Sequence, residues 1–221
     1  MKCCVLLPAY NEEKTIGALV NDVRAQGLDV IVVDDGSKDN TAAVAEQSQA
    51  VVLKHAQNQG KGKALRTGFD HVINNRYDGV IVMDADGQHS EGEIQNFIKL
   101  AEESEAGIII GNRMHNPQGM PFVRRMTNII TSSVVSALVG DNIPDSQCGF
   151  RLIKTEVLKK LSLSTINYDT ETEILLEASR AKFRIESIPI KTVYADQKSQ
   201  INPFIDTLRF WSLIIRSLFK K

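Results

Sequence analysis

The chain has 221 residues, of which 43% are hydrophobic and 24% are charged, and its formal net charge is −1. This composition is ordinary for a globular protein of one large domain, and the near-neutral charge excludes a general electrostatic attraction to nucleic acid. The N-terminal apolar run is too short for a secretory signal, and no stretch approaches the ~18 apolar residues that span a bilayer, so we expect a cytoplasmic protein.

Short apolar runs alternate with helical patterns in the first half of the chain. The runs predict buried strands at 3–7, 30–33, 51–53, 79–83 and 107–111, and the patterns between them predict helices after Asn11, at 41–47, at 62–74 and around 94–101. Asn11 is expected to cap the first helix, with Glu12 and Glu13 near its positive end. Cys3 and Cys4 lie in the first strand, so we expect reduced, buried thiols rather than disulfides or a zinc site. The alternation is typical of an α/β fold with a mostly parallel central sheet flanked by helices.

The regular alternation of predicted strands and helices ends after residue 112. We expect a helix at 122–139, a strand near 150–153, a helix at 171–180, a strand at 185–190 and a last helix at 203–221. The last helix places Phe204, Leu208, Trp211, Ile215 and Leu218 on one face, with Arg209, Arg216 and Lys220 on its flank. A basic amphipathic helix of this kind can lie in a membrane interface, or it can pack on the domain or on a second subunit. We therefore expect one domain over 1–200, with halves 1–112 and 113–200, and a C-terminal amphipathic helix over 201–221.

Polar clusters directly follow four of the predicted strands. They are Pro8–Glu12 after the first strand, Asp34–Ser37 after the second, Asp84–His89 after the fourth and Gly111–Arg113 after the fifth. The carboxyl ends of parallel strands meet at one edge of a sheet, which is where such folds bind ligands. The sequence therefore predicts a binding site at this edge.

Asp84 and Asp86 are the sharpest chemical signal, because their spacing at a strand end lets both carboxylates turn toward one point. Mg²⁺ and Mn²⁺ prefer oxygen ligands and commonly keep one or two protein carboxylates together with substrate phosphates. Gln88 and His89 are possible further ligands, and the alternative is that the aspartates cap a helix or pair with lysines. Lys61 either faces a bound nucleotide or lies in solvent, since its surroundings do not match the GxxxxGK[ST] pattern of a P-loop.

Five motifs in chain order resemble those of the family 2 glycosyltransferases, in particular the dolichol-phosphate mannosyltransferase and polyprenyl-phosphate glycosyltransferase group. They are Pro8-Ala9-Tyr10-Asn11-Glu12, Asp34-Asp35-Gly36-Ser37, Asn58-Gln59-Gly60-Lys61-Gly62, Asp84-Ala85-Asp86-Gly87-Gln88-His89 and Asp145-Ser146-Gln147-Cys148-Gly149-Phe150-Arg151. The resemblance covers roughly residues 3–195. It implies a Rossmann-like GT-A fold, a GDP- or UDP-sugar donor and inversion at the anomeric carbon.

The resemblance also implies roles for individual residues. The nucleotide would be bound by Pro8, Tyr10, Glu12, Asp35, Lys61 and Asp84, and the metal, Mg²⁺ or Mn²⁺, by Asp84, Asp86 and Gln88. Arg113 and Arg124, with Asn128 nearby, would grip an acceptor phosphate, a task that suits the planar fork of arginine. Asp86 and Arg113 are then expected to take part in catalysis. Apart from the resemblance, the position of Lys198, Ser199 and Gln200 just before the last helix leads us to expect that they form a mobile loop over the donor.

Because of the acidic segment 169–173, the sequence does not decide between a phosphate and a hydroxyl acceptor. A polyprenyl phosphate or other lipid-linked phosphate is already charged and needs no base, whereas a hydroxyl on a sugar, lipid or protein needs a carboxylate to take its proton. Asp169 or Glu171 could supply that base, or the segment could simply cap the following helix. A sugar-1-phosphate nucleotidyltransferase is disfavoured, because Pro8–Glu12 stands where that class carries a Gly-rich loop with arginine. A non-catalytic module that binds nucleotide-sugar, and peripheral contact with the inner face of a membrane, also remain open.

Overall fold

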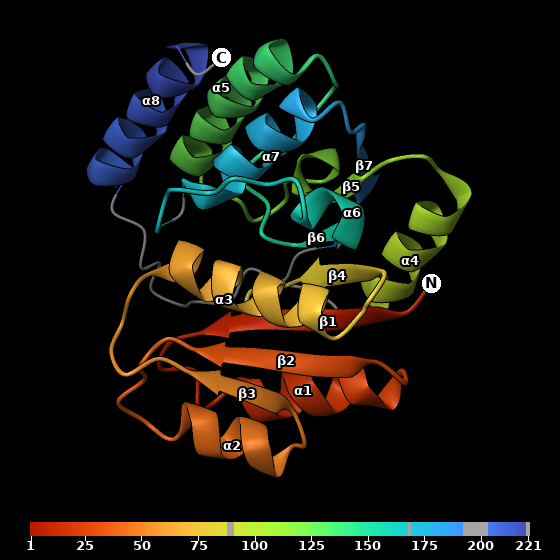
Figure 1. Cartoon of the computed structure of the whole chain (residues 1–221). Helices are drawn as coiled ribbons and strands as arrows, with labels where there is room; N and C mark the ends of the chain where they lie inside the picture. The colour runs from red at the N-terminus through yellow and green to blue at the C-terminus, as the bar shows by residue number, and fades with distance from the viewer. Residues whose placement is uncertain (88–90, 168, 192–202, 220–221) are drawn as a thin grey trace.

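Seven strands form one sheet in the spatial order β3-β2-β1-β4-β6-β5-β7 (Figure 1). The strands are β1 Cys3–Ala9, β2 Asp29–Asp34, β3 Val51–Lys54, β4 Gly79–Val82, β5 Ile108–Asn112, β6 Arg151–Lys154 and β7 Ile185–Pro189. Only β6 runs antiparallel, between β4 and β5, so the sheet is mostly parallel as the sequence predicts. The computed structural model describes residues 1–87, 91–167, 169–191 and 203–219, except for the side chains of 203–206.

Helices cover both faces of the sheet (Figure 1). They are α1 Ile16–Ala25, α2 Thr41–Gln47, α3 Lys61–Asn74, α4 Ile94–Glu103, α5 Phe122–Val139, α6 Thr155–Leu158, α7 Thr170–Arg180 and α8 Pro203–Phe219, with short 3₁₀ turns η1 Glu91–Glu93 and η2 Arg113–His115. On one face α1 and α2 pack on β2, while on the other α3 packs on β1 and β2 and contacts α6 and α7. Within the described ranges, no helix combines the length and the hydrophobicity needed to cross a membrane.

The first helix begins later than predicted, and the expected capping role of Asn11 is wrong. The helix α1 starts at Ile16, Thr15 holds the N-cap position, and Asn11 has a left-handed backbone with φ 58°. The cause is tertiary, because the backbone N–H groups of Asn11 and Glu12 donate to the hydroxyls of Ser37 and Thr41 at 2.9 and 2.7 Å. These bonds hold residues 11–15 as a loop along the end of β2, and so place Glu12 at the predicted binding edge.

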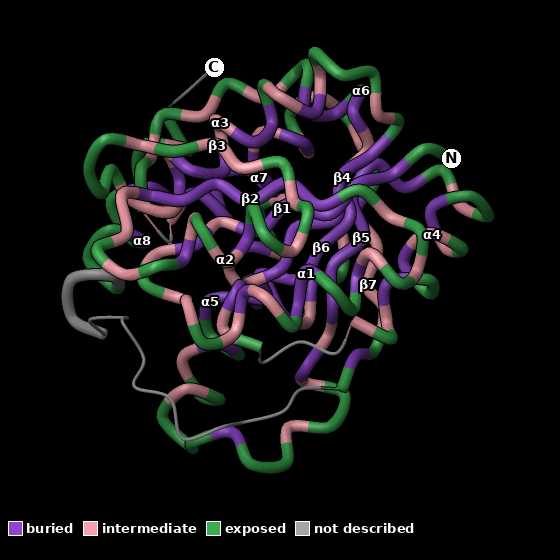
Figure 2. The backbone as a smooth tube through the Cα atoms, turned by 90° about the horizontal axis from the view of Figure 1, so that it is seen from below, coloured by how far each residue is buried: buried purple, intermediate pink, exposed green. Residues whose placement is uncertain are grey.

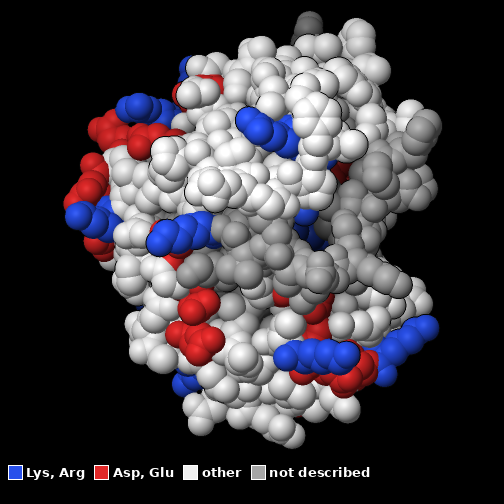
Figure 3. Space-filling view, turned by 180° about the vertical axis from the view of Figure 1, so that it is seen from behind, with Lys and Arg blue, Asp and Glu red and all other residues white. Residues whose placement is uncertain are grey.

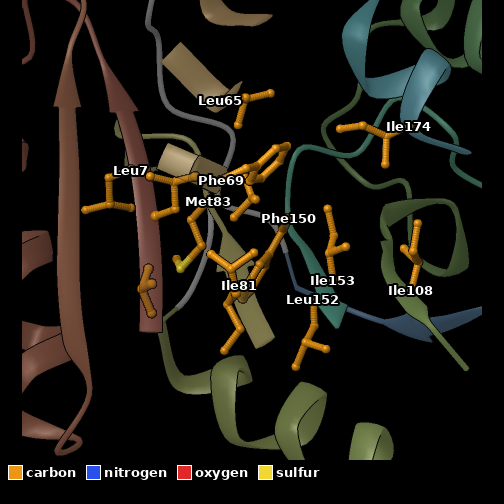
Figure 4. Close-up of a cluster of buried hydrophobic side chains, with 14 of the residues drawn as sticks. Leu7, Leu65, Phe69, Ile81, Met83, Ile108, Phe150, Leu152, Ile153 and Ile174 are labelled. Atoms are coloured by element: carbon orange, nitrogen blue, oxygen red, sulfur yellow. The ribbon is translucent and has the colours of Figure 1, made fainter. Parts of the chain in front are cut away.

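The core lies between the sheet and its helices, where the five inner strands are buried along most of their length (Figure 2). The edge strands β3 and β7 are mostly partly buried or exposed. Phe69 of α3 and Ile81 of β4 lie near Phe150 in this core (Figure 4). The ring of Phe150 stacks on Phe97 of α4, with 4.4 Å between the ring centroids. All three cysteines are buried and unbridged, and burial raises the pKa of Cys148 to about 12. Thiols with such a raised pKa stay protonated at neutral pH, as expected for structural cysteines.

Candidate active site

A buried lysine joins the two halves of the chain at the carboxyl edge of the sheet. Lys61, the first residue of α3, places its Nζ 2.5 Å from Oδ1 of Asp84 and 2.7 Å from Oε1 of Glu171 on α7. Burial by itself would lower the pKa of Lys61, but the charges of Asp84 and Glu171 outweigh it and raise that pKa above its ordinary value. With its side chain only 14% exposed, Lys61 does not lie in solvent, which removes that alternative.

Further carboxylates come to this edge of the sheet from two loops. Asp84 and Asp86 follow β4, and Glu12 comes from the loop after β1. Partial burial raises the pKa of Glu12, and the charges of Asp86 and Asp84 add to the rise while the hydroxyl of Thr15 opposes it. That hydroxyl lies 3.0 Å from Oε2 of Glu12 and donates to the carbonyl of Ala85 at 2.8 Å, so it ties the two loops together. The surface is hollowed on this side of the molecule (Figure 3).

Gly149 makes room for Asp84. A Cβ at Gly149 would lie 2.6 Å from Oδ2 of Asp84, closer than any real side chain allows. The backbone here is held by the fully buried Arg151, whose guanidinium donates to the carbonyls of Cys148 at 2.6 Å and Glu171 at 2.9 Å. The backbone at Gly149 therefore lies against one side of the Asp84 carboxylate, where no side chain would fit.

This arrangement fits a divalent cation held by few protein ligands. In the part of the chain that the structure describes, no three His, Cys, Asp or Glu side chains form a closed metal cluster. Mg²⁺ and Mn²⁺ do not need one, since they take one or two carboxylates and complete their shell with water and substrate phosphates. Asp84 and Asp86 would supply those carboxylates, while Gln88 and His89 lie outside the described residues. The predicted loop of Lys198, Ser199 and Gln200 lies outside them as well.

Replacing Gly149 by alanine is expected to weaken Mn²⁺ binding by about tenfold, the usual cost of disturbing a group that orients a metal ligand. The new methyl group must push Asp84 away from its place. Electron paramagnetic resonance of free Mn²⁺, titrated with protein and UDP, measures the affinity. Gly27→Ala is the control, because nothing lies within 4 Å of its added methyl group. Its left-handed backbone, with φ 79°, should cost the control variant some stability but leave its Mn²⁺ affinity unchanged. Equal Mn²⁺ affinities for the two variants would contradict the prediction.

Asp35 lies beneath the loop that follows β3. Its Oδ1 is 2.6 Å from Nδ1 of His55 and accepts the N–H of Gln59 at 3.0 Å, and its Oδ2 accepts the N–H of Gly60 at 2.8 Å. The carboxylate expected to contact a nucleoside is thus engaged within the chain and shapes the loop. A shallow, open depression of about 550 Å³ lies beside that loop. It is lined by Gln57, Asn58, Gln59, Gly60, Lys63, Ile166, Asn167 and Arg209.

Arg113 and Asn128 come together through a partner that sequence reasoning did not assign. The guanidinium of Arg113 donates from Nε and Nη2 to the two oxygens of Asp145 at 2.7 and 2.8 Å, and Nδ2 of Asn128 donates to Oδ1 of Asp145 at 2.6 Å. Burial opposes ionisation of Asp145, but the hydrogen bonds and charge of Arg113 prevail and lower its pKa. Asp145 opens one of the five family motifs, and its place in that motif was the available signal. Arg124 lies apart from this network, partly exposed on the first turn of α5.

The three carboxylates of the acidic segment have three different surroundings. Glu173 accepts hydrogen bonds at 2.7 to 3.0 Å from the backbone and hydroxyl groups of Ser164 and Thr165, which outweigh its burial and lower its pKa. Glu171 is paired with Lys61. Asp169 holds the N-cap position of α7 but makes no side-chain cap bond. Burial raises the pKa of Asp169, and its Oδ1 is buried without a partner among the described residues.

The chain's similarity to known proteins identifies its family. The sequence profile described as Glycosyl transferase family 2 matches residues 4–162. The chain belongs to glycosyltransferase family 2. Over 87% of its length this glycosyltransferase is 33% identical to the UDP-N-acetylglucosamine--dolichyl-phosphate N-acetylglucosaminyltransferase of Methanococcus voltae, of which it covers 86%. It is also 29% identical to the polyprenol monophosphomannose synthase of Mycolicibacterium smegmatis, with 84% of this chain and 75% of that protein covered.

The fold agrees with the family. The glucosyl-3-phosphoglycerate synthase of Mycobacterium tuberculosis, solved with Mn²⁺, UDP and glucosyl-3-phosphoglycerate, superimposes with a TM-score of 0.74 at 18% identity, over 98% of this chain and 78% of that one. The predicted GT-A fold and the predicted resemblance to polyprenyl-phosphate glycosyltransferases are therefore confirmed.

Proposed function

We propose that this glycosyltransferase moves a sugar from a GDP- or UDP-sugar to a polyprenyl phosphate, with inversion at the anomeric carbon. One observation carries the proposal: Asp84 contacts the buried Lys61 at the edge of the sheet. The carboxylates of Glu12 and Asp86 lie close enough for their charges to interact. Lipid-phosphate acceptors in the names of the relatives from M. voltae and M. smegmatis support the acceptor class.

The chemistry follows from the charges. An oxygen of the acceptor phosphate attacks the anomeric carbon, the bond from that carbon to the donor diphosphate breaks, and a nucleoside diphosphate leaves. A divalent ion bound by Asp84 and Asp86, with Gln88 as a further ligand in the proposal, would neutralise the leaving diphosphate. Lys61 is paired with Asp84 and Glu171, so a contribution of its positive charge to the diphosphate would require it to leave one of these carboxylates.

The remaining roles divide between the two halves of the domain, 1–112 and 113–200. We assign the nucleoside to Pro8, Tyr10, Glu12 and Asp35, and the acceptor phosphate to Arg113, Arg124 and Asn128. Because Asp145 already engages Arg113 and Asn128, direct contact of Arg113 with a phosphate requires that buried pair to rearrange.

The second candidate is transfer to a hydroxyl acceptor, and the surroundings of the Asp169 carboxylate favour it. Its raised pKa and its buried Oδ1 are what a general base near the acceptor would show. Glu171 is less suited to that task, because its carboxylate is committed to Lys61.

The proposal is tested first by binding and then by transfer. GDP- and UDP-sugars are screened by thermal shift with and without Mn²⁺, since a ligand that binds the folded state raises the midpoint of unfolding. The best donor, radiolabelled in its sugar, is then incubated with a polyprenyl phosphate and with the corresponding polyprenol. Transfer to the phosphate alone supports the proposal. Transfer to the polyprenol alone, or no donor binding at all, contradicts it.

Replacing Asp169 by asparagine separates the two acceptor classes. With a phosphate acceptor we expect kcat to change by less than about fivefold, because no proton has to be removed, whereas loss of a general base costs about 10² to 10⁴-fold. The initial rate of nucleoside diphosphate release with saturating donor and acceptor is the measurement. Glu156→Gln, at an exposed position of α6, is the control. A loss of two orders of magnitude in the Asp169 variant alone would favour the hydroxyl acceptor.

A further inference from the structure

Lys61 is shared between two carboxylates that differ in their burial. The side chain of Glu171 on α7 is 8% exposed, whereas that of Asp84, in the loop after β4, is 29% exposed. A carboxylate that loses its counter-ion in a buried place costs much more free energy than one that water can reach. Asp84 is therefore the partner that Lys61 can leave at the lower cost.

The backbone next to Lys61 is fixed to the segment that leads into α7. The N–H of Gly62 donates to the carbonyl of Ile166 at 2.9 Å, and an added Cβ at Gly62 would collide with the hydroxyl of Thr170. The helices α3 and α7 contact each other (Figure 1). The start of α3 is thus attached to the same element that carries Glu171, independently of the loop after β4.

The carboxylate of Asp84 has a positive charge at one oxygen and backbone beside the other. Its Oδ1 lies 2.5 Å from the Nζ of Lys61, and the backbone at Gly149 leaves no room for a side chain next to its Oδ2. A divalent ion bound by this carboxylate would lie next to the ammonium group, and like charges repel strongly in a partly buried site. Lys61 and a divalent ion therefore compete for Asp84.

We propose that Glu171 is a positioning residue for the metal site, because it holds Lys61 when Asp84 exchanges that lysine for a divalent ion. One positive and two negative charges sum to −1 in this group of three, so it keeps a net attraction for a cation. Without Glu171 the sum would be zero, and Lys61 would hold Asp84 more firmly. The inference rests on the proposed function, since that function assigns the divalent ion to Asp84.

Two substitutions should shift the affinity for Mn²⁺ in opposite directions. Glu171→Gln should lower it by at least about tenfold, within the range found for residues that orient a metal ligand. Lys61→Met should raise it by at least about fivefold, because the competitor for Asp84 is removed. Electron paramagnetic resonance of free Mn²⁺, titrated with protein without any nucleotide-sugar, measures both affinities. A purely structural role of the ion pair would lower the affinity in both variants.

Two further variants test whether Glu171 acts through the lysine. In the Lys61→Met background, Glu171→Gln should change the Mn²⁺ affinity much less than it does in the wild type, since residues that act through each other are not additive. Glu171→Asp keeps the charge and should bind Mn²⁺ more tightly than Glu171→Gln. Near-ultraviolet circular dichroism checks each fold, and if Lys61→Met does not fold, the comparison of Glu171→Asp with Glu171→Gln decides.

The ion pair of Lys99 and Glu103 on α4, with side chains 73% and 62% exposed, provides the matched controls. Lys99→Met and Glu103→Gln remove the same charges and should bind Mn²⁺ like the wild type. Equal affinities of Glu171→Gln, Glu171→Asp and the wild type, or weaker binding by folded Lys61→Met, would overturn the inference. Transfer of sugar to a polyprenyl phosphate is measured separately on the wild type. Transfer together with unshifted affinities defeats only the role of Glu171, and opposite shifts without transfer to any acceptor defeat only the proposed function.

Discussion

Replacing Asp84 by asparagine is expected to lower kcat by about 10³-fold, equivalent to about 4 kcal/mol of transition-state stabilisation. The variant loses the negative charge that would hold the divalent ion, and it leaves Lys61 with one carboxylate partner fewer. Because the Asp84 side chain is 29% exposed, the substitution should leave the fold intact. Release of nucleoside diphosphate at saturating donor and Mn²⁺ measures kcat, and near-ultraviolet circular dichroism checks the fold.

Asp70→Asn is the matched control, since Asp70 lies on the exposed side of α3 and the same charge is removed. It should keep the wild-type rate. If Asp84→Asn retained full activity with normal Mn²⁺ dependence, the metal would have to be held elsewhere, and the proposed role of this carboxylate would be wrong.

Replacing Asp145 by alanine is expected to lower the free energy of unfolding by about 3 to 5 kcal/mol, the cost of leaving one member of a buried ion pair without its partner. Asp145 is 1% exposed and Arg113 is 5% exposed, so water cannot replace the lost carboxylate. For a chain of this size the midpoint of thermal unfolding should fall by roughly 6 to 20 °C. Differential scanning calorimetry measures the change.

The exposed pair of Glu46 and Lys54 provides the comparison. Its side chains are 52% and 51% exposed, and Glu46→Ala should cost less than about 1 kcal/mol. Equal losses of stability for Glu46→Ala and Asp145→Ala would show that the buried network contributes no more than a surface ion pair.

The stabilisation by Asp145 should depend on pH. Its pKa is lowered in the folded protein, so its contribution is fully present above the ordinary pKa of 3.8 and is lost as the pH falls through the lowered folded value. The difference in unfolding free energy between wild type and Asp145→Ala should therefore shrink as the pH is lowered below about 4. Urea titrations at pH 7 and at a series of acidic values test this, and a constant difference would contradict it.

Local patterns in the sequence predicted most of the secondary structure. The run 122–139 predicts a helix with the bounds of α5, and the short apolar runs predict β1 to β5 with shifts of at most two residues. These predictions succeed because a buried strand or a covered helix must repeat its apolar residues with its own period. The antiparallel direction of β6 and the short helix α6 escaped prediction, since neither leaves a periodic signal in only four residues.

By itself, then, the sequence determined the fold class, the family motifs and the sheet edge at which Asp84 lies. Only the tertiary structure decided the partners: Lys61 meets Glu171 across 110 residues, and Arg113 meets Asp145 across 32. It also decided that α5 buries Asn128, Thr131 and Ser132 and turns Phe122 and Val123 outward. The physical reason is that periodicity reports which residues share a face, whereas burial and pairing depend on what the rest of the chain brings to that face.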